Sequence, residues 1–172
     1  MEFNKICCFF GHRKIDETED LKVKLYTIIE NLIVNKKIDT FLFGSKSEFD
    51  DLCHKVVSEL KDKHPQIKRI YVRSAFQHIP EWYEESLLKY YEATYFPKHM
   101  QKAGRGIYVE RNREMINHSK ICVVYYDEFY TPPKRRNCKG NLTNYQPKSG
   151  TAVAYDYAVK KKKTIINVFT KK

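Results

Sequence analysis

The sequence contains little glycine or proline, no long apolar run and no regular cysteine motif. Six glycines and six prolines in 172 residues, with a hydrophobic fraction of 42%, exclude a collagen-like, low-complexity or disordered chain. No segment approaches the roughly 18 consecutive apolar residues that a membrane span requires. The length predicts one domain over residues 1–172, with a core that needs no disulfide support. We therefore expect a soluble protein that does not act in a membrane.

The five cysteines are odd in number and form no C-x-x-C motif. The N-terminus also lacks a basic segment followed by an apolar signal core, so we expect a reducing, cytoplasmic location. Cys7 and Cys8 are adjacent, and in a strand they would point to opposite faces, which makes them poor joint metal ligands. The histidines show no metal-ligand spacing. The sequence thus predicts neither a metal nor a cofactor.

The net charge of +11 is confined to two stretches of the chain. Residues 129–155 hold five basic residues and no acid, and residues 157–172 hold six lysines and no acid. The chain has no helix lined with arginine and no RNP-type strand of aromatic residues, so we do not expect nucleic acid as its partner. The first stretch is interpreted as an electrostatic rim for a small anion. The lysines of the second complement a helix end and need no partner.

Short apolar strands alternate with amphipathic helices along the chain. Strands are expected at residues 5–10, 40–43, 67–72, 121–126 and 164–168. Helices are expected at residues 19–34, 47–64, 82–92, 109–118 and 149–159. This alternation predicts an α/β fold: a doubly wound, mainly parallel sheet of about five strands with helices on both faces. Residues 127–148 show no periodic pattern and form either a lid over the sheet or a surface insertion.

Glycines and polar residues follow three of the predicted strands. In a doubly wound sheet the ligand binds outside the carboxyl ends of the strands. Glycine lets the backbone approach a ligand closely, and a helix N-terminus binds phosphate. The sequence therefore predicts a phosphate-bearing ligand at this edge. The residues expected to contact it are Gly11, His12, Arg13, Gly44, Ser45, Ser149, Gly150 and Thr151.

Some of these positions also have a purely structural explanation. Ser47 and Asp50 fit a capping box, and Ser149 fits a simple helix cap. Arg13 gains little from packing directly after a buried strand, so we interpret it as functional.

Three further residues are candidates for the same crevice. Arg111 and Asn112 lie in the first turn of a predicted helix, from which both could reach the ligand. Asp127 follows the fourth predicted strand and is either an acceptor for a ribose hydroxyl or a turn residue.

Five segments spread over nearly the whole chain carry a known pattern. They are CCFFGHR, FGSKSEFD, YVRSAFQ with Trp82 downstream, ERNREM and SGTAVAYDYA. Together they resemble the SLOG superfamily of Rossmann-like nucleotide-binding proteins, and CCFFGHR and the Phe49-Asp50 pair are most similar to its YpsA-like family. The resemblance implies a nucleotide or nucleotide-derived ligand, with Phe49 and Asp50 in the binding site. It also implies self-association into a homo-oligomer.

Two of these segments, ERNREM and SGTAVAYDYA, also resemble the signatures of the lonely-guy phosphoribohydrolases. The resemblance implies that Arg111 matches the arginine that acts on the glycosidic bond, whereas Ala154 stands where these enzymes carry a glutamate. Cleavage of an N-glycosidic bond needs a carboxylate. The sequence therefore favours a sensor or sequestering module over a hydrolase that uses Arg111 and Glu110. A basic nucleic-acid-binding protein is the third hypothesis.

Overall fold

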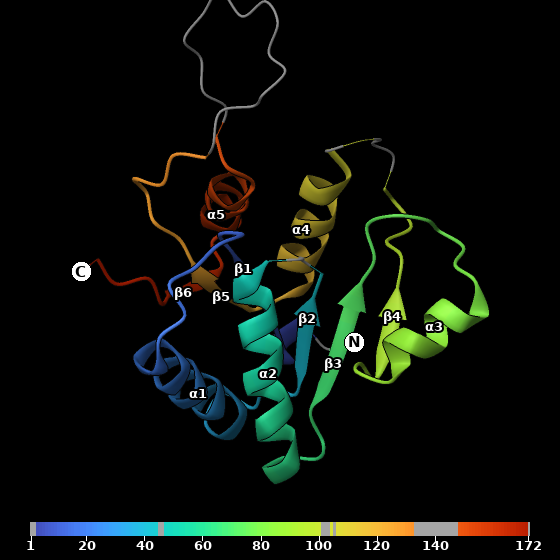
Figure 1. The fold of residues 1–172 in the computed structure, drawn as a ribbon, viewed down its shortest axis with the longest axis horizontal. Coiled ribbons are helices and arrows are strands. Elements are labelled where there is room, and N and C mark those ends of the chain that lie inside the picture. Colours follow the sequence, from blue (N-terminus) through green and yellow to red (C-terminus); the bar gives the residue numbers. More distant parts are fainter. Residues whose placement is uncertain (1–2, 45–46, 101–103, 105, 133–147, 172) are drawn as a thin grey trace, which may run out of the picture.

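The fold is built on one parallel sheet. The computed structural model describes residues 3–44, 47–100, 104, 106–132 and 148–171. Six strands lie in the order β4-β3-β2-β1-β5-β6, and every neighbouring pair is parallel (Figure 1). The strands are β1 (Ile6–Gly11), β2 (Thr40–Phe43), β3 (Lys68–Val72), β4 (Ala93–Tyr95), β5 (Ile121–Tyr125) and β6 (Thr164–Asn167).

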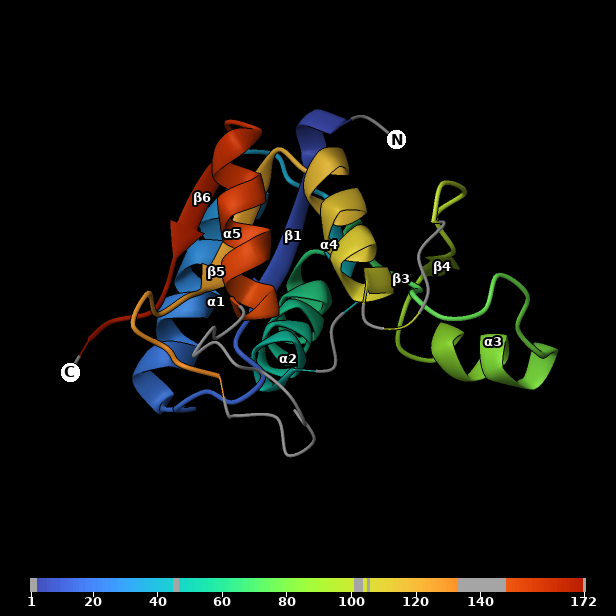
Figure 2. The same ribbon diagram turned by 90° about the horizontal axis from the view of Figure 1, so that it is seen from above.

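Helices cover both faces of this sheet. They are α1 (Glu19–Val34), α2 (Glu48–Lys63), α3 (Glu81–Leu88), α4 (Gly106–His118) and α5 (Gly150–Lys160), preceded by the 3-10 turn η1 (Phe3–Lys5). One core cluster lies between the sheet and α1 and α2, and the other lies between the sheet and α4 and α5 (Figures 1 and 2). The predicted doubly wound α/β fold is confirmed. No helix within the described residues is long and apolar enough to cross a membrane.

The central strand β1 shows how the sequence produces these two layers. Cys7 and Phe9 pack in the cluster with α1 and α2, whereas Cys8 and Phe10 pack in the cluster with α4 and α5. A strand buried on both faces accounts for the uninterrupted apolar run. Burial raises the pKa of the Cys7 thiol well above its ordinary value, so this thiol stays protonated. Cys7 and Cys8 thus point to opposite faces, as predicted, and both belong to the packed core.

The sheet has one strand more than the sequence predicted. β4 covers three residues, all half-buried, and α3 packs against it without burying any residue of its own. A strand of this length is too short to show an alternating pattern. The helix predicted at residues 82–92 runs instead from Glu81 to Leu88. It ends early because the chain must turn after Leu88 to enter the extra strand at Ala93.

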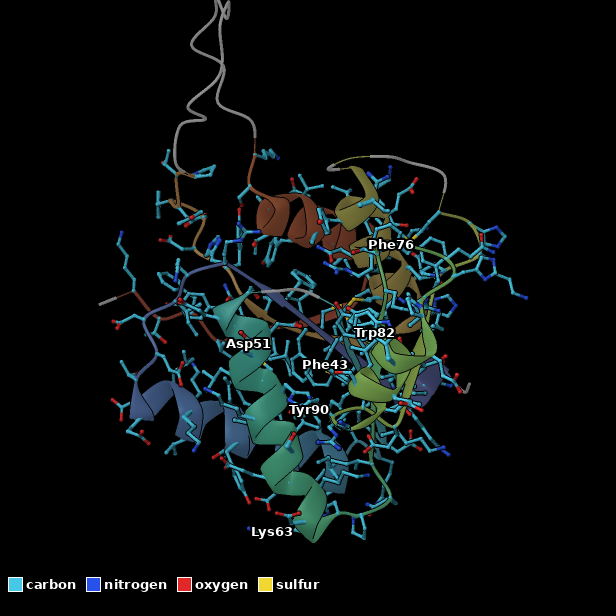
Figure 3. All side chains as sticks on the ribbon, turned by 45° about the vertical axis from the view of Figure 1, so that its right-hand side comes forward. Phe43, Asp51, Lys63, Phe76, Trp82 and Tyr90 are labelled. Carbon is cyan, nitrogen blue, oxygen red and sulfur yellow. The ribbon has the colours of Figure 1, made fainter. Side chains whose placement is uncertain are left out.

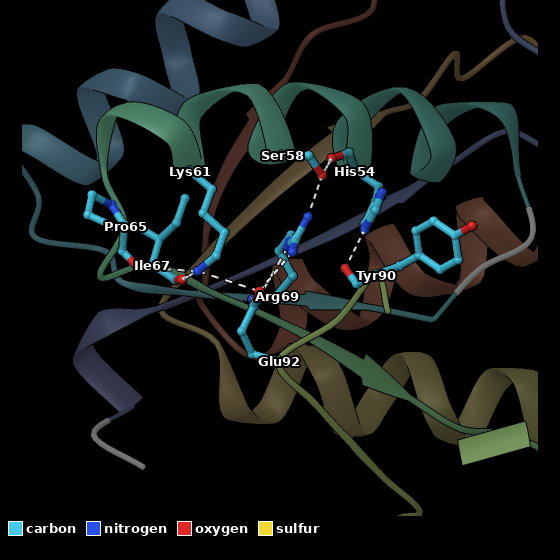
Figure 4. Close-up of polar contacts among 8 residues, drawn as sticks. All are labelled: His54, Ser58, Lys61, Pro65, Ile67, Arg69, Tyr90 and Glu92. Atoms are coloured by element: carbon cyan, nitrogen blue, oxygen red, sulfur yellow. Dashed lines mark hydrogen bonds and ion pairs between the residues drawn. The ribbon is translucent and has the colours of Figure 1, made fainter. Parts of the chain in front are cut away.

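Hydrogen bonds and ion pairs hold the start of this extra strand to the rest of the fold (Figure 4). The Glu92 carboxylate accepts from the Arg69 backbone N–H at 2.6 Å and from Arg69 Nη2 at 2.7 Å. Arg69 Nη1 donates to Ser58 Oγ of α2 at 2.8 Å. Burial acts to raise the pKa of Glu92, but the hydrogen bonds from Arg69 and the charges of Arg69 and Lys61 outweigh it, so this pKa lies below its ordinary value. Glu92 therefore joins α2, β3 and the segment that enters β4.

We expect Glu92→Ala to lower the free energy of unfolding by about 1.5 kcal/mol, because it removes charge-assisted hydrogen bonds from Arg69. Urea unfolding followed by circular dichroism measures this change. Glu59→Ala is the matched control, because Glu59 forms only an exposed ion pair within the described part of the chain, with Lys22 at 3.0 Å. Its loss should cost less than about 1 kcal/mol. Equal effects of the two substitutions would contradict the anchoring role of Glu92.

Candidate functional site

A cavity of about 800 Å³ lies at the carboxyl ends of the strands. Its wall is built from the residues that follow β1, β2 and β3, from the start of α3 and from the first turn of α5. The first two turns of α4 complete it, and because α4 begins at Gly106, Arg111 and Asn112 lie in its second turn and not in the first turn as predicted. This volume lies within the range of roughly 300 to 1,000 Å³ that is usual for small-molecule sites. The predicted site residues that line it are Gly11, His12, Arg13, Gly44, Arg111, Asn112, Ser149, Gly150 and Thr151.

Phe49 and Asp50 do not line the cavity. Phe49 is fully buried, and a Cβ atom placed on Gly11 would stand 2.5 Å from its Cδ1 atom. Gly11 therefore makes room for the Phe49 ring, and Phe49 packs in the core where we expected a ligand contact. Asp50 is 3% exposed, and its Oδ2 atom accepts from the Gly44 N–H at 3.3 Å. Asp50 thus bonds the backbone beneath the site.

Two further predicted positions, Asp127 and Glu110, are not among the described residues that line the cavity either. Asp127 Oδ1 accepts from the Phe129 N–H at 2.9 Å. Asp127 therefore acts as a turn residue, the second of the two roles predicted for it, and this oxygen faces the backbone of its own turn. Glu110 is half-buried on α4 and is not among the described residues that line the cavity. Ser45 lies outside the described residues, as does most of the predicted lid, residues 133–147.

Arg111 is a buried charged residue in the cavity wall. Its side chain is 4% exposed, its Nη1 donates to the Gly44 carbonyl, and its Nε donates to Asn112 Oδ1 at 3.1 Å. Its Nη2 group makes no hydrogen bond to any residue that the structure describes. A Cβ atom on Gly44 would stand 2.5 Å from Arg111 Cδ. Glycine is needed at position 44 so that the guanidinium can reach the end of β2.

The cavity is electropositive. Burial lowers the pKa of Arg111 and the negative charge of Asp50 opposes this effect, so the guanidinium stays charged. Arg13 and Arg73 also line the cavity, and its described lining residues include no aspartate or glutamate. A concave site lined by charges of one sign concentrates ligands of the opposite sign. The described residues contain no cluster of three or more side chains suited to a metal ion.

His12 offers a second donor in the same wall. It is 2% exposed, and its Nε2 atom accepts from the Asp127 N–H at 2.9 Å. This bond places the proton of the neutral ring on Nδ1. Nδ1 is buried and has no hydrogen-bond partner among the described residues, while the ring packs 4.1 Å from the Tyr130 ring centroid. His12 thus holds a buried donor that lacks an acceptor among the described residues.

The N-terminus of α5 completes the polar part of the site. Ser149 Oγ accepts from the Ala152 N–H at 3.1 Å, so the predicted cap is present. Gly150 and Thr151 follow in the cavity wall, and nothing stands within 4 Å of the position of a Cβ atom on Gly150. The positive end of the helix dipole favours an anion there.

Sequence reasoning missed the aromatic part of the wall. Phe76 follows β3 and is 77% exposed, and Trp82 lies on α3 and is 69% exposed (Figure 3). Both line the cavity, together with Tyr71, Tyr83, Tyr108 and Tyr130. The sequence does hold a signal for them. Phe76, Trp82 and Tyr83 follow a predicted strand closely, and their spacing does not place them together on the buried face of a helix or strand.

No protein-family model matches the chain, and no curated protein sequence matches it. Among solved structures it is similar to DNA processing protein A from Streptococcus pneumoniae, with 12% identity, a TM-score of 0.55, and coverage of 92% of this chain and 48% of that one. It is also similar to DNA processing protein A from Helicobacter pylori, described in its single-stranded DNA binding mode, with 15% identity, a TM-score of 0.56, and coverage of 94% and 64%.

A third similar structure is the molybdenum cofactor carrier protein from Chlamydomonas reinhardtii, with 13% identity, a TM-score of 0.51, and coverage of 94% of this chain and 74% of that one. The chain thus spans between 48% and 64% of the length of the two DNA processing proteins. At these identities the similarity establishes the Rossmann-like fold alone.

The partial or full burial of two histidines makes stability depend on pH: His12 is buried and His54 is half-buried. Burial lowers the pKa of His12 and of His54 from 6.5, so below about pH 6.5 the unfolded chain binds more protons than the folded one. We therefore expect the urea midpoint of unfolding to fall as the pH is lowered from about 7.5 to 5.5. The double variant His12→Asn/His54→Asn should show a shallower fall, and His99→Asn, at an exposed histidine, should match the wild type. Identical slopes for all three proteins would contradict this account.

Proposed function

We propose that this chain binds a nucleotide or nucleotide-derived small molecule at the carboxyl ends of β1, β2 and β3, as a sensor or sequestering module. The observation that carries the proposal is the buried guanidinium of Arg111, which lines the cavity with an Nη2 group that no described residue bonds. A buried charge is costly unless it is paired and hydrogen-bonded. The charge of Asp50 offsets this cost only in part, and a phosphate oxygen supplies a further negative charge and the acceptor for Nη2, in a strong charge-assisted bond.

Two further donors support a phosphate at this place. The His12 Nδ1–H is buried without a partner among the described residues. At the start of α5 the Ala152 and Val153 N–H groups donate to Ser149, which leaves those of Gly150 and Thr151 for a ligand. Both line the same cavity as Arg111. Three donors of different kinds, with no carboxylate among the described lining residues, favour an anion over a neutral ligand.

The proposal includes membership of the SLOG superfamily. The Rossmann-like fold supports this membership. The CCFFGHR, ERNREM and SGTAVAYDYA segments support it as well, because they contribute Gly11, Arg111 and Gly150 to the wall of one cavity. The YpsA-like branch is supported by CCFFGHR and the Phe49-Asp50 pair alone. One domain over residues 1–172, a cytoplasmic location and a homo-oligomer stay predictions of the sequence.

The hydrolase alternative has less support. Its chemistry needs a carboxylate beside the glycosidic bond. Glu110 and Asp127 are the acids that sequence reasoning offered for that role, and neither is among the described residues that line the cavity. Asp50 lies beneath Gly44 with one oxygen bonded to its backbone. We therefore propose binding in place of turnover.

Single-stranded nucleic acid is a second candidate ligand, favoured by one observation. Phe76 and Trp82 are exposed aromatic rings in the wall of an electropositive cavity, and successive bases stack on such rings. The similar structure from Helicobacter pylori is described in a single-stranded DNA binding mode.

Isothermal titration with AMP, GMP, ADP-ribose and cyclic di-AMP tests the first proposal. We expect at least one of these probes to bind, and Arg111→Lys to weaken it by about tenfold or more, because a lysine cannot reproduce the planar set of donors. Arg113→Gln is the matched control, since Arg113 is exposed on the same helix and does not line the cavity. It should bind as the wild type does. If no probe binds the folded wild-type protein, the proposal fails.

Titration with a 20-nucleotide oligodeoxythymidylate separates the two candidates. We expect only weak binding, which disappears between about 50 and 200 mM salt because it rests on phosphate contacts alone. The nucleotide should keep most of its affinity over this range. Tight oligonucleotide binding at about 200 mM salt that displaces the nucleotide would instead favour nucleic acid as the ligand.

A further inference from the structure

We propose that Phe76 and Trp82 form an aromatic platform on which the base of the bound nucleotide stacks. This inference rests on the proposed function and names the part of the ligand that the site selects. The cavity then recognises a phosphate ester that also carries a nucleobase, and it discriminates against sugar phosphates that lack one.

The exposure of these two rings is the first observation. Most large apolar side chains of the described protein are packed in the two core clusters, yet Phe76 and Trp82 are 77% and 69% exposed. Both belong to the wall of the same cavity that contains Arg111. Aromatic surface left in contact with water at a concave site is typical of a ligand contact.

The backbone beneath Phe76 is the second observation. Phe76 has a φ of 61°, in the left-handed region that residues with a side chain rarely adopt. Arg73 Nη1 donates to the carbonyls of Phe76 at 3.2 Å and of Gln77 at 3.1 Å, and the Arg73 N–H donates to the Tyr95 carbonyl at 2.8 Å. Arg73 thus ties the strained turn to the edge of the sheet. Strain of this kind persists only where the surroundings hold it, and it concentrates at binding sites.

Trp82 is positioned by a different element. It lies in the first turn of α3, where the Tyr83 N–H donates to the Pro80 carbonyl at 3.0 Å. Its ring meets the Tyr83 ring edge-on, with centroids 5.7 Å apart and planes at 60°. None of the residues of α3 is buried, so the helix presents its aromatic side chains without contributing to the core.

The two kinds of group in the cavity wall together define the class of ligand. Arg111, His12 and the N-terminus of α5 supply polar groups, and Phe76 and Trp82 supply planar apolar surface. A volume of about 800 Å³ admits a ligand that reaches both. A nucleobase joined to a phosphate has the matching pair of groups, and every base has a π-face that can stack.

Trp82 is the one tryptophan of the chain, so its fluorescence reports on the platform directly. The test adds AMP, GMP, ADP-ribose, cyclic di-AMP or ribose 5-phosphate to the wild-type protein and records Trp82 emission alongside calorimetry. We expect the base-bearing probe that binds to quench or shift the emission, and ribose 5-phosphate to leave it unchanged. We also expect ribose 5-phosphate to bind about tenfold more weakly or worse, because it cannot stack.

Substitutions separate the platform from the phosphate end. Phe76→Ala and Trp82→Ala should each weaken the base-bearing probe by about tenfold and leave ribose 5-phosphate binding unchanged, whereas Trp82→Phe should restore most of the affinity. Phe129→Ala is the matched control, because Phe129 is 68% exposed but does not line the cavity. It should have no effect on either probe.

The outcomes distinguish the two proposals. If a base-bearing probe binds but Trp82 emission stays constant and Phe76→Ala binds normally, the platform is overturned and the proposed function stands. Equal affinity for ribose 5-phosphate and the base-bearing probes would also overturn the platform. If none of the probes binds the folded wild-type protein, both proposals fail.

Discussion

A single buried guanidinium organises the carboxyl edge of this sheet. Arg111 reaches from α4 to the carbonyl of Gly44 at the end of β2, and Asp50 at the start of α2 bonds the N–H of the same glycine. The charge of Asp50 partly offsets the cost of burying Arg111. A buried ion that loses its partner is strongly destabilising, so β2, α2 and α4 must keep this relative placement. The cavity exists where these three elements meet around the charge.

The positive charge of the cavity has an unexpected origin. The net charge of +11 comes from two stretches, residues 129–155 and 157–172, yet the arginines that line the cavity lie in the balanced part of the chain. They are Arg13, Arg73 and Arg111. The net charge of the chain therefore does not indicate the charge of this cavity. The cavity is positive because its described lining residues include three arginines and no acid. Local placement, not total charge, makes the cavity attractive to an anion.

Much of the fold could be predicted from the sequence because β1, β2 and β5 are buried on both faces. Such strands are uninterrupted apolar runs, and each run ends at a glycine or a polar residue that the eye can find. β4 could not be predicted, because three half-buried residues carry no pattern. Its place is set by a distant contact, the pairing of Glu92 with Arg69, to which local sequence gives no clue.

The sequence predicted several residues that line the cavity, but not the packing that requires glycine at two of these positions. The rule that ligands bind beyond the carboxyl ends of the strands led to Gly11, His12, Arg13 and Gly44, and all four line the cavity. The two glycines were expected to admit a ligand, whereas they admit the Phe49 ring and the Arg111 side chain. Which side chain crosses to a given backbone position depends on packing between helices and cannot be derived from spacing along the chain.

The central claim is that one ligand spans the cavity, with its phosphate at Arg111 and its base on Phe76 and Trp82. A crystal structure of the protein with a bound nucleotide tests this claim most directly. We expect phosphate oxygens within hydrogen-bond distance of Arg111 Nη2 and His12 Nδ1, and a base stacked on the two aromatic rings. A nucleotide bound outside this cavity, or one whose phosphate lies away from Arg111, would contradict it.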